Sequence, residues 1–166
     1  MNVDNLSERY NVRKLTPNDL IIILELCSKN EIYYKYHPHF ATNESIIEDM
    51  KVLPPSKEGK DKFYIGYFEK GKLIAIMDLI LGYPQDKIAY IGFFMMSIEF
   101  QKKDIGTSII EECLGYLSNI GFEKIRLAID KGNLQSEFFW TKNNFIKTGE
   151  EYPNDISTYI PMERVF

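Results

Sequence analysis

A buried strand followed by a polar loop and a long helix is the feature that most constrains the fold of this chain. Residues 91–96 are almost wholly apolar, which is typical of a central strand covered on both faces. A short loop separates this strand from a stretch of helical periodicity over residues 104–120. The apolar face of that helix would consist of Ile105, Ile109, Cys113 and Leu117. The sequence therefore predicts a central strand within a sheet and an amphipathic helix that packs against it.

The segments on either side of this unit alternate between strand and helix patterns. Strands are expected at residues 10–15, 63–68, 73–81, 88–96, 124–129, 145–150 and 157–162. Helices are expected at residues 16–29, 42–53, 104–120 and 133–142, with a loop or broken helix at 30–42. Short turns join the strands between residues 63 and 96, which favours antiparallel neighbours. The expected fold class is α/β, with a mixed, mostly antiparallel central sheet flanked by helices, in a single domain over residues 1–166.

Charge and cysteine content exclude several classes of protein. The net charge is −4 and no block of Lys or Arg stands out, so a nucleic-acid partner is not expected. Cys27 and Cys113 have no metal-site or redox spacing, which indicates two buried free thiols and no metal site. The first residues carry no signal-like apolar run, and no apolar segment is long enough to span a bilayer. These observations predict a cytoplasmic protein with no membrane partner.

The loop between the apolar strand and the long helix suits an anion. The start of a helix offers unpaired backbone N–H groups and the positive end of the helix dipole, and both favour a phosphate group. Gly106 would let phosphates approach the backbone closely. Most loops of this kind only turn the chain, so this pattern alone indicates an anion site weakly.

Two motifs in this order resemble the signatures of the GNAT family of N-acetyltransferases. Residues 101–106, QKKDIG, are similar to the Gln/Arg-x-x-Gly-x-Gly/Ala motif that follows a buried strand and opens a helix. Residues 133–145, NLQSEFFWTKNNF, are similar to the second signature, Asn-x-x-Ala-x-x-Phe-Tyr-x-Lys-x-Gly-Phe. The resemblance covers about residues 8–164. It implies the acyl-CoA N-acyltransferase fold, acetyl-CoA or coenzyme A as the cofactor and an amine as the acceptor.

The resemblance also implies roles for individual residues in cofactor binding. Backbone amides around Phe94 and Met96 would pair with the pantetheine arm, and one of them would polarise the thioester carbonyl. Met95 and Met96 would either belong to the hydrophobic core or form a wall beside the pantetheine arm. Asn133 would hydrogen-bond the arm. The pyrophosphate would be held by amides of Gln101, Lys102, Lys103, Asp104, Ile105, Gly106 and Thr107.

Three positions depart from the family pattern. Asp104 stands where the family usually has Gly, so its side chain would either cap the helix or repel the pyrophosphate. Trp140 takes the place of the Tyr that often protonates the departing thiolate; it either assists near the cofactor by hydrogen bonding or only packs. Tyr90 lies where some relatives carry a Glu base.

A general base and an acceptor groove are expected on neighbouring segments. Asp78 lies in an otherwise apolar strand, which makes it the candidate base and acceptor contact; the alternative is an edge-facing or salt-bridged acid. Tyr33 and Tyr34, with Tyr90, would line an acceptor groove. His37 and His39 favour surface or packing positions. Arg126 and Asp130 fit roles in sheet-face ion pairs better than roles in catalysis.

Two functional hypotheses follow from the sequence. The first is an acetyl-CoA-dependent N-acetyltransferase that moves an acetyl group to a primary amine of a small molecule or peptide by direct attack on the thioester. The second is a non-catalytic module of the same fold that binds coenzyme A as a sensor or interaction partner. A homodimer is the expectation at the level of the family.

Overall fold

The computed structural model describes residues 1–166 and consists of one sheet with helices on both faces. The strands are β1 (Asn11–Lys14), β2 (Lys62–Glu69), β3 (Lys72–Leu81), β4 (Ile88–Met96), β5 (Lys124–Asp130), β6 (Ile146–Lys147), β7 (Tyr152–Pro153) and β8 (Thr158–Val165). The helices are α1 (Leu20–Ser28), α2 (Glu31–Tyr36), α3 (Asn43–Asp49), α4 (Ile105–Asn119) and α5 (Leu134–Lys142). No helix combines the length and the apolar character that a membrane span requires.

The strand order confirms a mixed, mostly antiparallel sheet. The order is β1-β2-β3-β4-β5-β8-β6, and β7 pairs with β8 outside this path. Only β4 and β5 run parallel, and the long helix α4 makes the crossover between them. The α/β fold class expected from the sequence is therefore confirmed.

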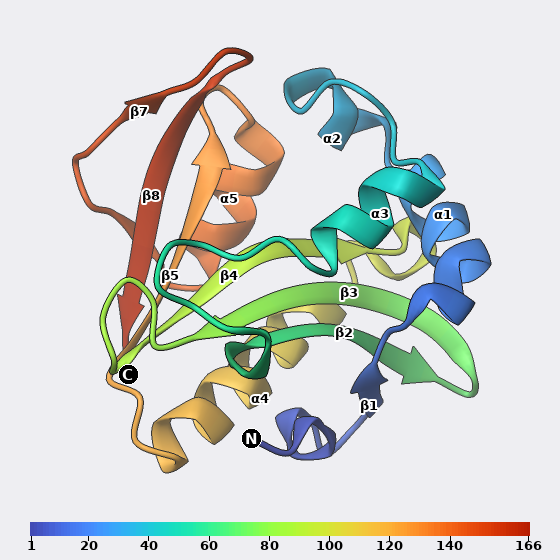
Figure 1. Cartoon of the computed structure of the whole chain (residues 1–166), viewed down its shortest axis with the longest axis horizontal. Helices are drawn as coiled ribbons and strands as arrows, with labels where there is room; N and C mark the ends of the chain where they lie inside the picture. The colour runs from blue at the N-terminus through green and yellow to red at the C-terminus, as the bar shows by residue number, and fades with distance from the viewer.

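Each face of the sheet carries its own hydrophobic core. On one face the core joins α4 and α5 to the strands through side chains such as Ile109, Leu117 and Trp140. On the opposite face, α1 and α3 contribute Ile23, Leu26 and Ile46 to a second core. Figure 1 shows α4 below the sheet, and α1 and α3 at the side of β2 and β3 away from β5.

Element boundaries follow the capping signals of the sequence closely, with a few exceptions. Thr16 and Asp19 form a capping box with Pro17 in the first turn, and Thr42 caps α3 through the N–H of Ser45. The segment expected to be a loop or broken helix contains the short helix α2. The C-terminal strand is longer than expected, and the strand expected at 145–150 is reduced to β6, while β7 carries no pattern in the sequence that predicts it.

The sheet opens where β4 and β5 stop pairing. Their register ends at Ile91 and Leu127, although β4 continues to Met96 and β5 to Asp130. Figure 1 shows β5 and β8 turning away from β2, β3 and β4, so that the sheet forms a V. The second half of β4 therefore has no strand partner on its β5 side. The expectation of a buried strand holds for Ile91, Met95 and Met96, but residues 92–94 face the opening and are partly or fully exposed.

A β-bulge lies at the point where the two strands separate. Asp78 pairs with Phe93 and Leu79 pairs with Ile91, which leaves Gly92 as the extra residue. A Cβ at this glycine would lie 2.8 Å from Oδ2 of Asp78, so a larger residue would collide with that carboxylate. The bulge thus uses a residue without a side chain at the apex of the V.

Candidate active site

A cavity of about 620 Å³ occupies the opening between β4 and β5. One end reaches the loop before α4, and its lining there includes Lys102, Asp104 and Thr107. Its middle follows residues 91–96 of β4 and the facing end of β5. The other end meets α2 and β8, with Tyr33 and Tyr159 in its wall. The cavity therefore joins the loop that the sequence predicts as an anion site to the aromatic segment that it predicts as an acceptor groove.

The loop before α4 presents a run of unpaired backbone donors. The amides of residues 102–107 have no hydrogen-bond acceptor within the protein, whereas the amide of Ser108 already bonds the carbonyl of Asp104. Ile105 begins a helix of 15 residues, so the positive end of its dipole coincides with these donors. Free amides and a helix dipole at one end of a cavity form a site with the chemistry to hold a diphosphate.

Asp104 does not cap α4 with its side chain. It occupies the N-cap position with φ of 58°, and no side-chain cap bond is present. Its carboxylate is exposed and accepts a hydrogen bond from Lys142 Nζ at 2.6 Å. The left-handed backbone explains why a glycine suits this position, because residues with a Cβ adopt it at a cost. Of the two alternatives that the sequence left open for Asp104, side-chain capping of the helix is therefore not present.

We expect Asp104→Gly to tighten the binding of acetyl-CoA several-fold. The change removes a negative charge from the cavity, releases Lys142 to meet a phosphate and relieves the left-handed backbone strain. Asp104→Asn is the matched control, because asparagine removes the charge but retains a Cβ. Calorimetric titration measures all three proteins, and an affinity for Asp104→Gly equal to or below that of the unsubstituted protein would contradict the expectation.

Gly106 has a packing role in the structure. It is buried in the first turn of α4, and a Cβ there would lie 3.0 Å from Cε2 of Phe139 on α5. The ring of Phe139 stacks against that of Phe94 on β4, with centroids 5.8 Å apart. The absence of a side chain at Gly106 therefore lets α5 approach α4, so close helix packing explains the glycine without an appeal to phosphate access.

The end of β4 is fixed to the loop by two amide side chains. Nε2 of Gln101 donates to Oδ1 of Asn30 at 2.8 Å and to the carbonyl of Met96 at 3.1 Å. Nδ2 of Asn30 donates to the same carbonyl at 3.1 Å. Asn30 is buried just before α2, and sequence reasoning missed it because its partners lie far away along the chain. These bonds hold the loop, β4 and α2 in a fixed relation around the cavity.

Asn133 and Trp140 line the cavity from α5. Asn133 is buried and caps the helix by accepting from the N–H of Ser136, so its side-chain amide N–H₂ stays available for a ligand. Trp140 packs among Phe94, Phe139 and Phe145, with ring centroids 4.9 to 5.8 Å away. The indole is thus a core residue that also forms part of the cavity wall, which supports the packing role left open by the sequence.

The far end of the cavity combines aromatic rings with one buried carboxylate. Tyr33 contacts Phe93 edge-on, with ring centroids 5.7 Å apart, and burial raises the pKa of Tyr33 above its usual range. Burial also raises the pKa of Tyr90 to about 12, so both phenols hold their protons at neutral pH. Asp130, at the end of β5, is 7% exposed, and it lines the same space.

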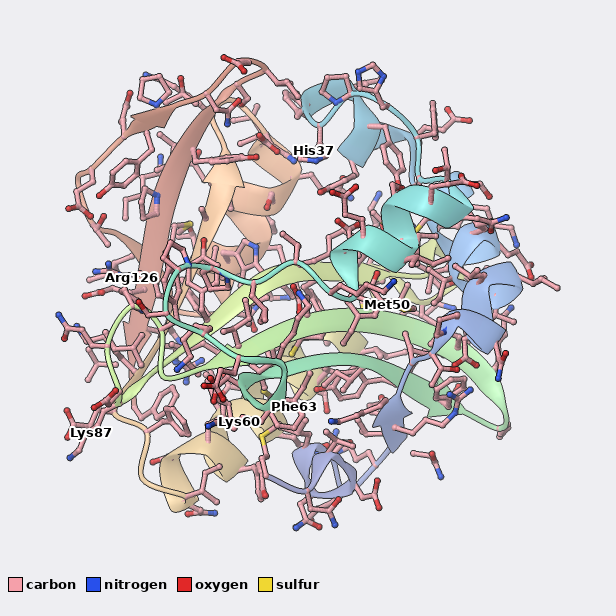
Figure 2. The ribbon with its side chains drawn as sticks, in the orientation of Figure 1. His37, Met50, Lys60, Phe63, Lys87 and Arg126 are labelled. Atoms are coloured by element: carbon pink, nitrogen blue, oxygen red, sulfur yellow. The ribbon has the colours of Figure 1, made fainter.

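Arg126 lies in a sheet-face ion pair, as the sequence suggested, whereas Asp130 pairs with no Lys or Arg side chain. Arg126 donates to Glu163 on β8, at 2.9 Å from Nη2. The nearest basic side chain to Asp130 is instead the imidazole of His37, whose Nδ1 lies 3.8 Å from Oδ2. Figure 2 shows the His37 ring directed from α2 toward the tips of β5 and α5, with Arg126 far from it. Asp130 and His37 are therefore site residues that sequence reasoning assigned to other roles.

Asp78 lies outside the cavity. It is 7% exposed, and its Oδ2 accepts from Nζ of Lys62, a buried lysine of β2, at 2.6 Å. Burial raises the pKa of Asp78, although the hydrogen bond from Lys62 opposes this. A general base must reach the proton that it removes, either directly or through one water molecule. The structure thus corrects the assignment of Asp78 as base and acceptor contact: it is the salt-bridged acid that the sequence left as the alternative.

The other residues expected at the site divide into two groups. Residues that line the cavity as expected are Tyr33, Tyr90, Phe94, Met95, Met96, Gln101, Lys102, Asp104, Gly106, Thr107, Asn133 and Trp140. Lys103 and Ile105 belong to the same loop but do not line the cavity. Tyr34 packs instead against Phe40 and against the edge of Tyr33, so its place in the acceptor groove is not supported.

Comparison with known proteins agrees with this fold and motif order. Residues 28–145, more than half of the chain, match the model of the Acetyltransferase (GNAT) family. A search of curated proteins found no significant match. Among solved structures, an acetyltransferase from Thermus thermophilus has a TM-score of 0.76 at 16% identity, with 100% of both chains covered.

Two further solved structures have the same fold. The PaiA N-acetyltransferase from Thermoplasma acidophilum, in complex with coenzyme A, has a TM-score of 0.66 at 20% identity and covers 95% of this chain and 99% of its own. The spermidine N-acetyltransferase of Vibrio cholerae has a TM-score of 0.66 at 16% identity and covers 96% of this chain and 95% of its own. These identities establish a common fold, and the match of residues 28–145 establishes kinship: the chain belongs to the GNAT family of acetyltransferases.

Proposed function

We propose that this protein is an acetyl-CoA-dependent N-acetyltransferase that acts on a primary amine of a small molecule or peptide. The observation that carries the proposal is the cavity that runs from the unpaired amides before α4, along the unpaired half of β4, to an aromatic pocket with a buried carboxylate. One end has the chemistry to hold a diphosphate and the other has the chemistry to hold an amine. A transferase that joins two substrates needs such a continuous path.

Coenzyme A fits the residues that the structure brings together. The amides of residues 102–107 supply donors for the diphosphate, and the free edge of β4 supplies backbone groups for the amide-rich pantetheine arm. The side chain of Asn133 keeps two N–H donors for that arm. Bound acetyl-CoA supplies the reactive acetyl thioester. The amides near Phe94 and Met96 would polarise its carbonyl.

The residues of the site also limit which groups can take a proton from the amine and give one to the thiolate. An amine with a pKa of about 10.4 needs about 4.6 kcal/mol to lose its proton at pH 7, so a group or water near the acceptor must accept that proton. Trp140 can donate a hydrogen bond toward a departing thiolate but cannot protonate it, because the indole N–H is no acid. Tyr90, which holds its proton at neutral pH, is the phenol in the cavity wall on β4. Water or a tyrosine then supplies the proton to the thiolate.

The direct test is acetyl transfer across a panel of amines. Purified protein is mixed with acetyl-CoA and each amine, and a thiol reagent follows the release of coenzyme A while mass spectrometry identifies the product. We expect at least one primary amine to gain an acetyl group in an enzyme-dependent manner. The control replaces each amine by the corresponding alcohol, which should release no coenzyme A above background. A protein that binds coenzyme A tightly but acetylates no member of the panel would contradict the proposal and favour the non-catalytic module.

A further inference from the structure

The carboxylate of Asp130 is buried without a hydrogen-bond partner. The residue is 7% exposed, and Oδ1 is buried and makes no hydrogen bond. Oδ2 has only His37 Nδ1 within ion-pair distance, at 3.8 Å, which is too long for a hydrogen bond. A buried carboxylate that lacks partners costs stability, and such groups in native proteins require an explanation. Because Asp130 also lines the cavity, a ligand can supply the missing partner.

The charged neighbours of Asp130 are all engaged elsewhere or distant. Arg126, on the same strand, pairs with Glu163, and the adjacent Lys131 pairs with Glu151 at 2.8 Å. No lysine or arginine nitrogen lies within 4 Å of the Asp130 carboxylate. The protein therefore contains a negative group at the end of the cavity that none of its own fixed cations neutralises.

Aromatic side chains from three elements line the same end of the cavity as this carboxylate. Tyr159 of β8 is the direct cross-strand partner of Asp130, which places the two side chains on one face of the sheet. Tyr33 of α2 lies close enough for the Asp130 charge to help raise the pKa of its phenol. Phe93 of β4 packs edge-on against Tyr33 across the opening. Ring faces and a carboxylate together are the surroundings that an organic ammonium ion prefers.

We propose that Asp130, with Tyr33, Phe93 and Tyr159, forms a subsite that binds the acceptor as an alkylammonium ion. The inference rests on the proposed function in one respect: it takes the bound amine to be the acceptor of the acetyl group. The subsite itself is defined by residues of this chain. Its position on β5 beyond the last residue paired with β4 places it in the opening, where the thioester end of the cofactor would lie. The acceptor class is then a cationic aliphatic amine, and amines without positive charge are poor ligands.

The subsite is tested with simple probes and without acetyl transfer. Isotope-labelled protein without cofactor is titrated by NMR with n-butylammonium chloride, and with n-butanol as the uncharged probe of similar shape. The titration is repeated for Asp130→Asn and for Asp86→Asn, which makes the same change in an exposed turn. We expect the Kd of n-butylammonium to rise at least tenfold in Asp130→Asn and to change less than about twofold in Asp86→Asn. The alcohol should bind all three proteins equally weakly.

Two outcomes would overturn the subsite. The first is n-butylammonium binding in Asp130→Asn within twofold of the unsubstituted protein, and the second is an unsubstituted protein that binds the alcohol as well as the ammonium ion. Folding is checked by thermal unfolding, in which Asp130→Asn should be as stable as the unsubstituted protein or more so, because a costly buried charge is removed. Asp130→Ala repeats the comparison of n-butylammonium binding with a side chain that cannot form hydrogen bonds.

The experiment separates this inference from the proposed function. Ammonium binding that depends on Asp130, in a protein that transfers no acetyl group, would support the subsite and refute the enzyme. Acetyl transfer whose KM for the amine is unchanged in Asp130→Asn would refute the subsite and support the enzyme. If the subsite and the proposed acetyl transfer are both correct, Asp130→Asn should raise the KM of a cationic amine at least tenfold and leave the Kd of coenzyme A unchanged.

Discussion

Thr107→Glu is expected to weaken the binding of coenzyme A at least tenfold while the protein stays folded. Thr107 lines the cavity in the first turn of α4, beside amides that have no acceptor in the protein. A carboxylate at this place stabilises the helix through its dipole, but it repels a diphosphate. At about 4 Å and a water-like dielectric, each pair of like charges costs roughly 1 kcal/mol, so two phosphate charges account for a tenfold loss or more.

The matched control is Thr107→Gln, which has the same size as the glutamate variant and no charge. Its Kd for coenzyme A, measured by calorimetry, should stay within about threefold of the unsubstituted value. The defect of Thr107→Glu should shrink as salt is added, because screening weakens the repulsion between exposed charges. Equal losses in the two variants would show that crowding, and not charge, matters at this position. An unchanged Kd in Thr107→Glu would place the diphosphate elsewhere.

Lys62→Met is expected to lower the free energy of unfolding by about 3–5 kcal/mol, which is the usual effect of breaking a buried ion pair. Nζ of Lys62 and Oδ2 of Asp78 are 2.6 Å apart, and both residues are more than nine-tenths buried. The substitution leaves the Asp78 carboxylate without its one hydrogen-bond partner, since Oδ1 already has none. Denaturant unfolding measures the change.

Two further variants show whether the buried charge is the cause. Lys87→Met makes the same change in the exposed pair with Glu123 and should alter the free energy of unfolding by less than about 0.5 kcal/mol. The double variant Lys62→Met with Asp78→Asn buries no charge and should recover most of the loss. It should also keep kcat/KM within about threefold, because Asp78 lies outside the cavity. A tenfold loss of kcat/KM in that folded variant would restore Asp78 as the base.

Local sequence patterns predicted the fold well because each element carries its own signal. The apolar stripe of α4, the cap at Thr42 and the tight turns between β2, β3 and β4 act over a few residues, and the structure contains them all. The end of the cavity at the loop before α4 was predictable for the same reason, since this loop and the end of β4 are contiguous in sequence. Five of the seven residues from 101 to 107 therefore line this end of the cavity.

The end of the cavity at Asp130 was not predictable, because it is assembled from segments that are distant in sequence. Asp130 was expected to lie in a sheet-face ion pair, but the pairing of β5 with β8 joins Arg126 of the same strand to Glu163 and leaves Asp130 without a Lys or Arg partner. Asp78 looked like a functional acid because its partner, Lys62, lies on a different strand. Both errors have one cause: the partners of a buried charge depend on strand register, which single-sequence patterns do not contain.

The position of bound coenzyme A tests the central claim most directly. A crystal structure of the protein with coenzyme A should show the diphosphate oxygens within hydrogen-bond distance of the amides of residues 102–107, and the pantetheine arm alongside the unpaired half of β4. The thiol should point toward the pocket that contains Asp130. Cofactor density at any other surface, or an empty cavity at saturating coenzyme A, would contradict the account.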